Sequence, residues 1–232
     1  TRFSQYIGSR RSSPVVARSY NPELFFRVWR DGVYTRTNPS YWDFGYGHES
    51  NGQNINSEIA FQRALDDALQ NGDSHQSVRD ALSRGWDYVS IDWHKQWNTR
   101  FFPSLAGRTE THFEYRHFLS NGVLQGAPEE FNSWENPDPG VRTRDRFAGL
   151  KFSLQYNLLD RPCVSLVCFE RVELMQETGH ANPFENNTTR VELTTNLAGL
   201  PLHIWGRTGY NSNLVDYYHY SNSWGVGMEF NR

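Results

Sequence analysis

Two short segments of the chain contain the residue types needed for acyl transfer: GYGHESNGQ at residues 45–53 and SRGWD at residues 83–87. A serine supplies a nucleophilic oxygen, a histidine accepts its proton, and a carboxylate can orient that histidine. The candidates for these three roles are Ser50, His48 and Asp87. Chance His-x-Ser triplets are common, so this interpretation depends on where the surrounding elements place the three side chains.

Both segments belong to stretches with the period of two that is typical of β-strands. Alternate residues of a strand face opposite sides, so His48 and Ser50 of the predicted strand 39–50 share a face with apolar neighbours. Those neighbours are Trp42, Phe44 and Tyr46. In the predicted strand 86–97, Asp87 shares a face with Val89, Ile91 and Trp93. Because the two strands are expected to run antiparallel, the three polar groups should meet at one end of one apolar face.

The same alternation recurs along the chain and predicts an all-β protein. The expected strands are 22–32, 39–50, 86–97, 110–119, 146–157, 162–171, 188–197, 201–210 and 222–230. Long polar connectors alternate with shorter ones: 53–85, 120–145, 172–187 and 211–221 against 33–38, 98–109, 158–161 and 198–200. This pattern favours an antiparallel transmembrane β-barrel, with long outer loops and tight periplasmic turns, over a soluble β-sandwich. We treat residues 1–232 as one barrel domain.

The composition agrees with a barrel and excludes other classes of protein. Aromatic residues make up 15% of the chain, charged residues 21%, and the mean hydropathy is −0.73. Barrel strands alternate lipid-facing with lumen-facing residues, so a barrel can be hydrophilic on average. The chain has no run of about 18 apolar residues, which excludes a helical membrane protein. The net charge of −3, without a basic stripe, argues against a nucleic-acid partner.

One outer loop, at about 54–82, is expected to contain a small helical insert. Ser57 is a suitable N-cap, apolar residues then follow helical spacing, and Asn71-Gly72 is a suitable end. A second short helix is predicted at 75–82. The insert is interpreted either as a hairpin that plugs the barrel mouth or as a lid over the adjacent site.

The two cysteines, Cys163 and Cys168, both fall in the predicted strand 162–171. Their odd spacing places them on opposite faces of a regular strand. A disulfide between them is therefore not expected.

The two chemical motifs resemble the signature of the outer-membrane phospholipase A family. That family places His-x-Ser-Asn-Gly at the outer end of one strand and Ser-Arg-x-Trp-Asn at the start of the next. The stretch SSPVVARSYNPELFF at 12–26 resembles the family's lead into the preceding strand, and GYNSNLVDYYHYSNSWGVGMEF at 209–230 resembles its closing hairpin. The similarity covers residues 1–53, 83–97 and about 146–230.

The resemblance implies a twelve-stranded barrel in the bacterial outer membrane that acts as a homodimer on membrane phospholipid. The implied activity is calcium-dependent hydrolysis of acyl esters, as phospholipase A1, phospholipase A2 and lysophospholipase. By motif, Ser50 is the nucleophile, His48 the base, Asp87 its orienting partner, and the Gly52 amide part of the oxyanion hole. The implied Ca²⁺ ligands are the Gln53 carbonyl, the Ser83 hydroxyl and the carbonyl of Ser12 of the partner subunit.

The chain departs from the family pattern in three ways. Asp87 stands where the family usually has Asn; a carboxylate orients a histidine at least as well, so we expect activity to survive. Asp87→Asn should be mild if the family's usual residue works here, whereas a loss of about a thousandfold or more would show that this chain depends on its carboxylate. The insert separates Gln53 from Ser83. The matching region also begins partway through the family's third strand, so we expect further N-terminal strands and a secretory signal in the natural polypeptide.

Two other functions stay open at this stage. One is a lipid A deacylase or another outer-membrane esterase. The other is a non-catalytic barrel, such as a pore, an adhesin or a structural protein. A pore would concentrate its chemistry on lumen-facing positions rather than on the face of Ser50 and His48.

The nucleophile assignment predicts that Ser50→Ala abolishes ester hydrolysis without affecting folding. Hydrolysis in mixed micelles and heat-resistant migration on gels measure the two properties separately. Loss of both together would make Ser50 a structural residue.

Overall fold

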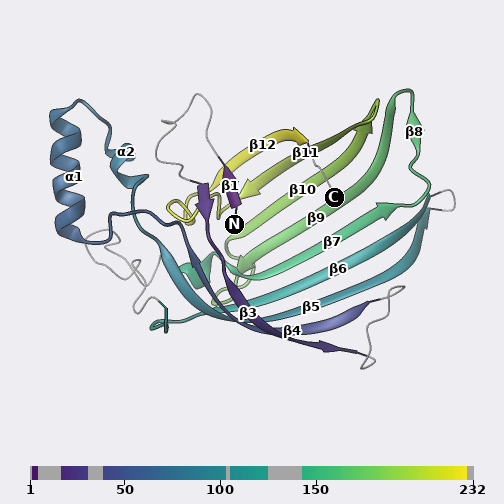
Figure 1. Cartoon of the computed structure of the whole chain (residues 1–232), viewed down its shortest axis with the longest axis horizontal. Helices are drawn as coiled ribbons and strands as arrows, with labels where there is room; N and C mark the ends of the chain where they lie inside the picture. The colour runs from purple at the N-terminus through teal and green to yellow at the C-terminus, as the bar shows by residue number, and fades with distance from the viewer. Residues whose placement is uncertain (1, 5–16, 31–38, 103–104, 125–142, 229–232) are drawn as a thin grey trace.

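The computed structural model describes residues 2–4, 17–30, 39–102, 105–124 and 143–228. They form an antiparallel sheet of ten strands, a small two-stranded ribbon and two α-helices (Figure 1). The sheet contains β3 (Glu23–Trp29), β4 (Ser40–Ser50), β5 (Gly85–Phe102), β6 (Leu105–Phe118), β7 (Gly149–Leu158), β8 (Cys163–Val164), β9 (Val167–Gly179), β10 (Asn187–Leu197), β11 (Leu200–Gly209) and β12 (Ser221–Met228). The ribbon pairs β1 (Arg2–Ser4) with β2 (Ala17–Ser19). The all-β prediction is confirmed.

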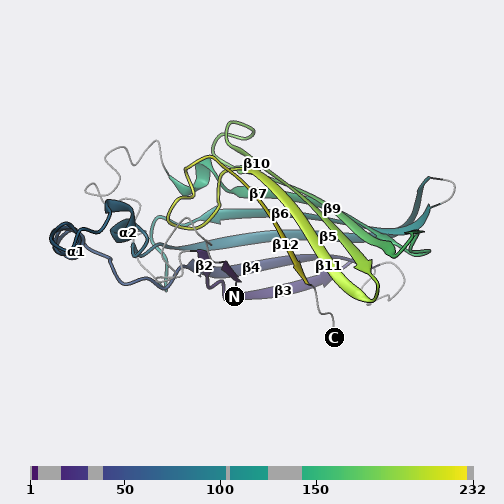
Figure 2. The ribbon, with the colours of Figure 1, turned by 90° about the horizontal axis from the view of Figure 1, so that it is seen from above.

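The strands follow one another across the sheet in chain order, apart from the short β8, which pairs with β9. The sheet is strongly curved and forms an open trough (Figures 1 and 2). In the described part of the chain β3 and β12 are the two edges of this sheet. A closed barrel remains a prediction.

The two faces of the sheet differ sharply in chemistry. One face presents large apolar side chains to the surroundings; Leu24 is 83% exposed, Phe26 71% and Trp224 79%. Every long strand contributes to it, through residues such as Trp42, Phe44, Ile91, Phe113, Phe152, Leu174, Val191, Ile204 and Val226. Polar and charged side chains cover the concave face, among them the buried Asp43, Glu49, Ser90 and Glu114. We call the first surface the outward face and the second the inward face.

The buried apolar core lies at one end of the sheet rather than between its faces. One cluster joins the loop insert to Val215, and a second joins Trp86 to Phe147, Leu214 and Tyr217. The Trp86 and Tyr217 rings meet edge to face with their centroids 5.5 Å apart. These contacts hold the loops at this end of the sheet together around the ends of β4 and β5, so this end is the part best able to position a site.

The helical insert forms as predicted. Helix α1 (Glu58–Gln70) begins after Ser57, whose hydroxyl accepts a hydrogen bond from the Ala60 N–H at 3.3 Å. The chain leaves this helix through Asn71 and Gly72, and Gly72 adopts a φ of 73° that favours glycine. Helix α2 (His75–Arg79) is shorter than predicted. Neither described helix is long and apolar enough to cross a membrane.

Two predicted connectors proved to be largely strand. Most of 98–109 belongs to β5 and β6, and β9 continues to Gly179 through the first half of 172–187. Several residues of β9 that point inward, such as Glu173 and Glu177, are charged, so the segment looks like a polar loop in the sequence. In the structure these side chains lie on the charged inward face, where a polar residue is compatible with a strand.

The prediction that Cys163 and Cys168 do not pair is wrong, because 162–171 is not one strand. The chain reverses between β8 and β9, where Ser165 takes a φ of 57°. This tight hairpin places the two cysteines directly opposite each other with their Cα atoms 4.0 Å apart, and a disulfide joins them. The odd-spacing argument applies only within a continuous strand.

The hairpin predicts that neither cysteine of the folded, oxidised protein reacts with an alkylating reagent. Mass spectrometry after iodoacetamide treatment should find both thiols unlabelled, and both labelled once a reductant has been added. Labelling of either cysteine before reduction would contradict the pairing.

Candidate active site

The register between β4 and β5 places His48 directly opposite Asp87. The His48 Nδ1 lies 2.6 Å from Asp87 Oδ1, within hydrogen-bond distance. The Asp87 side chain is fully buried, whereas the His48 side chain keeps 19% of its exposure. The pair therefore has the arrangement of an oriented base: a protected carboxylate holds one ring nitrogen while the ring itself stays accessible.

Ser50 lies two residues beyond His48, so both side chains leave β4 on the same face. Two backbone hydrogen bonds with Tyr20 fix the end of this strand, at 2.8 and 2.9 Å. Among the described residues, no hydrogen bond joins the Ser50 hydroxyl to His48. The structure thus brings the two groups to one surface without a hydrogen bond between them. Contacts between a nucleophile and its base are often long in the absence of substrate.

Asn51 organises the loop that follows Ser50, although the sequence analysis gave it no role. Its side chain is completely buried. The amide nitrogen donates to the Leu82 carbonyl at 2.7 Å. The amide oxygen accepts from the Arg84 N–H at 2.9 Å and from the Gln53 N–H at 3.3 Å. One side chain thus connects the segment after β4 to the segment before β5.

Gly52 occupies a position that suits glycine. Its φ is 60°, and a Cβ there would lie 2.9 Å from the Tyr20 ring. The local backbone is therefore held in a tight turn beside Ser50. An amide in such a turn is a suitable oxyanion donor.

The two described calcium-ligand candidates lie on segments that the structure brings together despite the insert. The Ser83 N–H donates to the Ile55 carbonyl at 2.8 Å, and the Ile55 N–H donates to the Ala81 carbonyl at 3.1 Å. With the Asn51 bonds, these contacts close the base of the insert, so the chain near Gln53 runs beside the chain near Ser83. A carbonyl and a hydroxyl are hard oxygen donors that fit calcium. Ser12 lies outside the described residues.

The carboxylate of Asp87 has two further partners that sequence analysis missed. Its Oδ2 accepts from the Tyr46 hydroxyl at 2.6 Å and from the Leu124 N–H at 2.7 Å. The Val123 N–H in turn donates to the Tyr46 hydroxyl oxygen at 2.9 Å. Tyr46 was noted only as part of the apolar stripe. No sequence signal indicates that a distant loop returns a backbone amide to Asp87.

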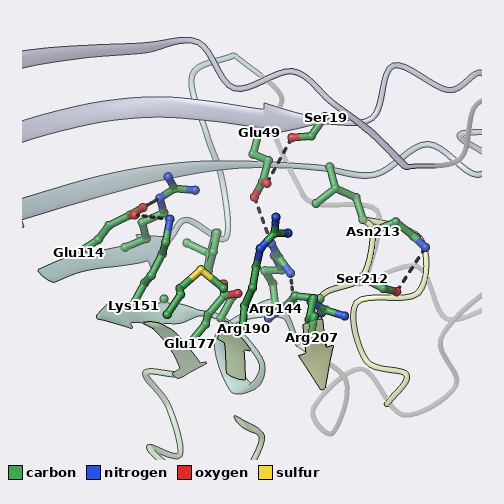
Figure 3. A pocket seen from close by; sticks show the side chains of 17 residues that line it. Ser19, Glu49, Glu114, Arg144, Lys151, Glu177, Arg190, Arg207, Ser212 and Asn213 are labelled. Atoms are coloured by element: carbon green, nitrogen blue, oxygen red, sulfur yellow. Dashed lines mark hydrogen bonds and ion pairs between the residues drawn. The ribbon is translucent and has the colours of Figure 1, made fainter. Parts of the chain in front are cut away.

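The inward face contains a separate cavity of about 200 Å³ (Figure 3). Charged side chains line much of it: Glu49, Glu114, Arg116, Arg144, Lys151, Glu177, Arg190 and Arg207. Several of these charges are paired, as in the 3.2 Å contact between Arg144 and Glu49. Glu49 also accepts from the Ser19 hydroxyl at 3.5 Å. The cavity is therefore lined in part by paired charges, and none of the described residues that line it is a histidine.

A smaller group on the inward face has the composition of a metal site. Asp92, His112 and Glu114 offer ligand atoms that all lie within 4.8 Å of one another. However, His112 Nε2 is already 2.9 Å from Asp92 Oδ1, and Glu114 forms ion pairs with Arg116 and Lys151. The group thus belongs to a network of hydrogen bonds and ion pairs.

No family model, no curated protein and no solved structure matches this chain. The resemblance to the outer-membrane phospholipase A family therefore remains a prediction based on the motifs. The geometry around Ser50, His48 and Asp87 has to support any function by itself.

The role of Asn51 predicts that Asn51→Ala disrupts the loop. The change removes the Asn51 hydrogen bonds of three backbone groups, two of them in the buried residues Leu82 and Arg84, and should cost about 2 kcal/mol or more of local stability. Proteolysis at 51–56 and 81–84 should become faster, while the strands keep their protection. Asn71→Ala, an amide deletion at the exposed end of α1, is the matched control; equal effects of both changes would contradict this role.

Proposed function

We propose that this chain is an outer-membrane phospholipase A, a serine hydrolase that cleaves the acyl esters of glycerophospholipids at its lipid-facing surface. The observation that supports this most is the 2.6 Å contact between His48 and Asp87, with Ser50 on the same face. A hydrolase of membrane lipid needs its nucleophile on the surface that touches lipid, and this is where Ser50 lies if the outward face is in a bilayer.

The distribution of apolar side chains supports a membrane location. Soluble monomers rarely expose apolar patches larger than a few hundred Å². Here the exposed apolar residues extend from β3 to β12, and the inward face is charged. This is the pattern of a transmembrane β-strand array. Closure into a barrel, location in a bacterial outer membrane and activity as a homodimer are parts of the same proposal.

The proposed reaction follows the chemistry of serine esterases. His48 Nε2 accepts the Ser50 proton while the Ser50 oxygen attacks the ester carbonyl, and the Gly52 N–H donates to the oxyanion. His48 then gives the proton to the departing lysophospholipid oxygen, which leaves an acyl group on Ser50. Water, deprotonated by His48, releases the fatty acid and restores the serine. Asp87 holds the His48 ring throughout.

Calcium is part of the proposal because Gln53 and Ser83 would hold the ion beside the oxyanion turn. When bound, the ion would add positive charge where negative charge develops in the transition state. The Asn51 hydrogen bonds support this, since they keep both oxygen donors on neighbouring segments.

A non-catalytic barrel is the main competing function, and the charge-lined cavity on the inward face favours it. Inward charges are also common in barrels that are enzymes, because the lumen is polar in both cases. The Ser50, His48 and Asp87 side chains on the outward face distinguish the two functions. A pore gains nothing from an oriented histidine on its lipid side, where a polar cluster has a desolvation cost.

The proposal predicts that the folded protein hydrolyses phospholipid in detergent micelles, that EDTA stops the reaction, and that added calcium restores it. Ser50→Ala should be inactive with unchanged heat-resistant folding. Activity that ignores EDTA would remove calcium from the proposal and leave an esterase. Hydrolysis of lipid A but not of phospholipid would indicate a deacylase, and no hydrolysis by the folded protein would contradict the proposal.

A further inference from the structure

The three hydrogen bonds to Asp87 divide the two oxygens of its carboxylate between different partners. Oδ1 faces His48 Nδ1, and Oδ2 accepts from the Tyr46 hydroxyl and the Leu124 N–H. We call the pair of groups on Oδ2, the Tyr46 hydroxyl and the Leu124 amide, the donor clamp. Both clamp groups can donate a hydrogen bond, and the Leu124 N–H, unlike the Tyr46 hydroxyl, cannot accept one.

The clamp is held in place from both sides. Tyr46 lies on β4, two residues before His48 and on the same face. Its hydroxyl oxygen accepts a hydrogen bond from the Val123 N–H, which belongs to the same turn as Leu124. Gly122 packs so closely on the carboxylate that a Cβ at this position would overlap it. The turn therefore fits directly against Asp87, and the side chain at position 87 has little freedom to rotate.

This division of oxygens fixes the tautomer of His48. An ionised carboxylate has no proton, so the hydrogen in the short contact to Oδ1 belongs to His48 Nδ1. The Nε2 atom is then left without a proton, as a general base for a serine requires. Tyr46 and Leu124 act on the base through Asp87 and do not touch the reacting atoms.

An asparagine at position 87 cannot satisfy the same partners. The Leu124 N–H requires an acceptor, so the amide oxygen would take the place of Oδ2. The amide NH₂ would then face His48 Nδ1 and donate to it. His48 would have to carry its proton on Nε2, and this atom could then no longer accept a proton from a serine.

We propose that the donor clamp makes the carboxylate of Asp87 obligatory in this chain, and that Tyr46 is a positioning residue of the site. The inference rests on the proposed function for its kinetic consequences but not for its structural ones. It reverses the expectation that Asp87→Asn is mild, because an asparagine fits this position only where no such clamp surrounds it.

The first test is the tautomer of His48, which can be measured whether or not the protein is an enzyme. Nitrogen NMR of histidine-labelled protein in micelles distinguishes a protonated Nδ1 from a protonated Nε2, and His48→Gln identifies the signal. We expect the proton on Nδ1 in the unmodified protein and on Nε2 in Asp87→Asn. The same tautomer in both proteins would overturn the proposal.

The second test is kinetic. Asp87→Asn should lower kcat by about a thousandfold or more, as expected for a base with the wrong tautomer. Tyr46→Phe should lower kcat by about 10- to 100-fold, the value of one hydrogen bond to a charged group, and leave KM unchanged. Tyr41→Phe is the matched control, since it removes a hydroxyl from the inward side of the same strand. A rise in KM alone for Tyr46→Phe would make that residue a lipid contact instead.

Coupling between the two positions tests whether Tyr46 acts through Asp87. In an Asp87→Asn background, Tyr46→Phe should cost less than it does alone, because the carboxylate that the hydroxyl positions is already gone. Losses that simply multiply would contradict a role through Asp87. If every protein is inactive and the tautomer still changes as expected, the clamp stands and the phospholipase proposal fails.

Discussion

The register between β4 and β5 is the constraint on which the rest of the site depends. It places His48 opposite Asp87, and the period of two then puts Ser50 on the same face. A shift of β4 by one residue would turn His48 and Ser50 to the charged inward face, away from Asp87 of β5, and would turn Asp43 and Glu49 outward among apolar residues. The separation of apolar and charged faces therefore fixes the chemistry at the end of the strands as well as the sheet.

The second requirement is a rigid end to the sheet. Strands alone do not supply it, because the apolar core lies in the loops, around Trp86, Tyr217 and the helical insert. Asn51 joins the two loop segments next to Ser50, and the turn at 120–124 closes over Asp87. The insert, whose base is closed by these bonds, lengthens the loop without separating the residues on either side of it.

Much of this organisation could be predicted from the sequence. Alternation alone located β4, β10, β11 and β12 and the outward position of His48, Ser50 and Asp87, because neighbouring residues determine the face of a strand. The helix at 58–70 followed from its cap and its spacing. The second half of β9 was predicted as a loop, because its polar residues resemble those of a connector. The prediction that the two cysteines do not pair failed for another reason. The hairpin that joins them depends on the positive φ of Ser165, which the sequence did not indicate.

The contacts that complete the site were beyond sequence reasoning. Asn51 belongs to the recognised motif, so its importance could have been suspected from position. The Leu124 amide could not, because a backbone N–H has no identity in the sequence and reaches Asp87 from 37 residues away. This is why an expectation taken from motif resemblance, that asparagine could replace Asp87, conflicts with the hydrogen bonds around this particular carboxylate.

The most direct test of the account is whether Ser50 is an activated nucleophile. An alkyl fluorophosphonate, which reacts with activated serines, would be added to the folded protein in micelles, and the modified residue identified by mass spectrometry. If Ser50 is activated by His48, we expect one label, on Ser50, that disappears in His48→Gln although folding is retained. A folded protein that takes up no label, or takes it up at another serine, would contradict the assignment of Ser50 and His48 as a catalytic pair.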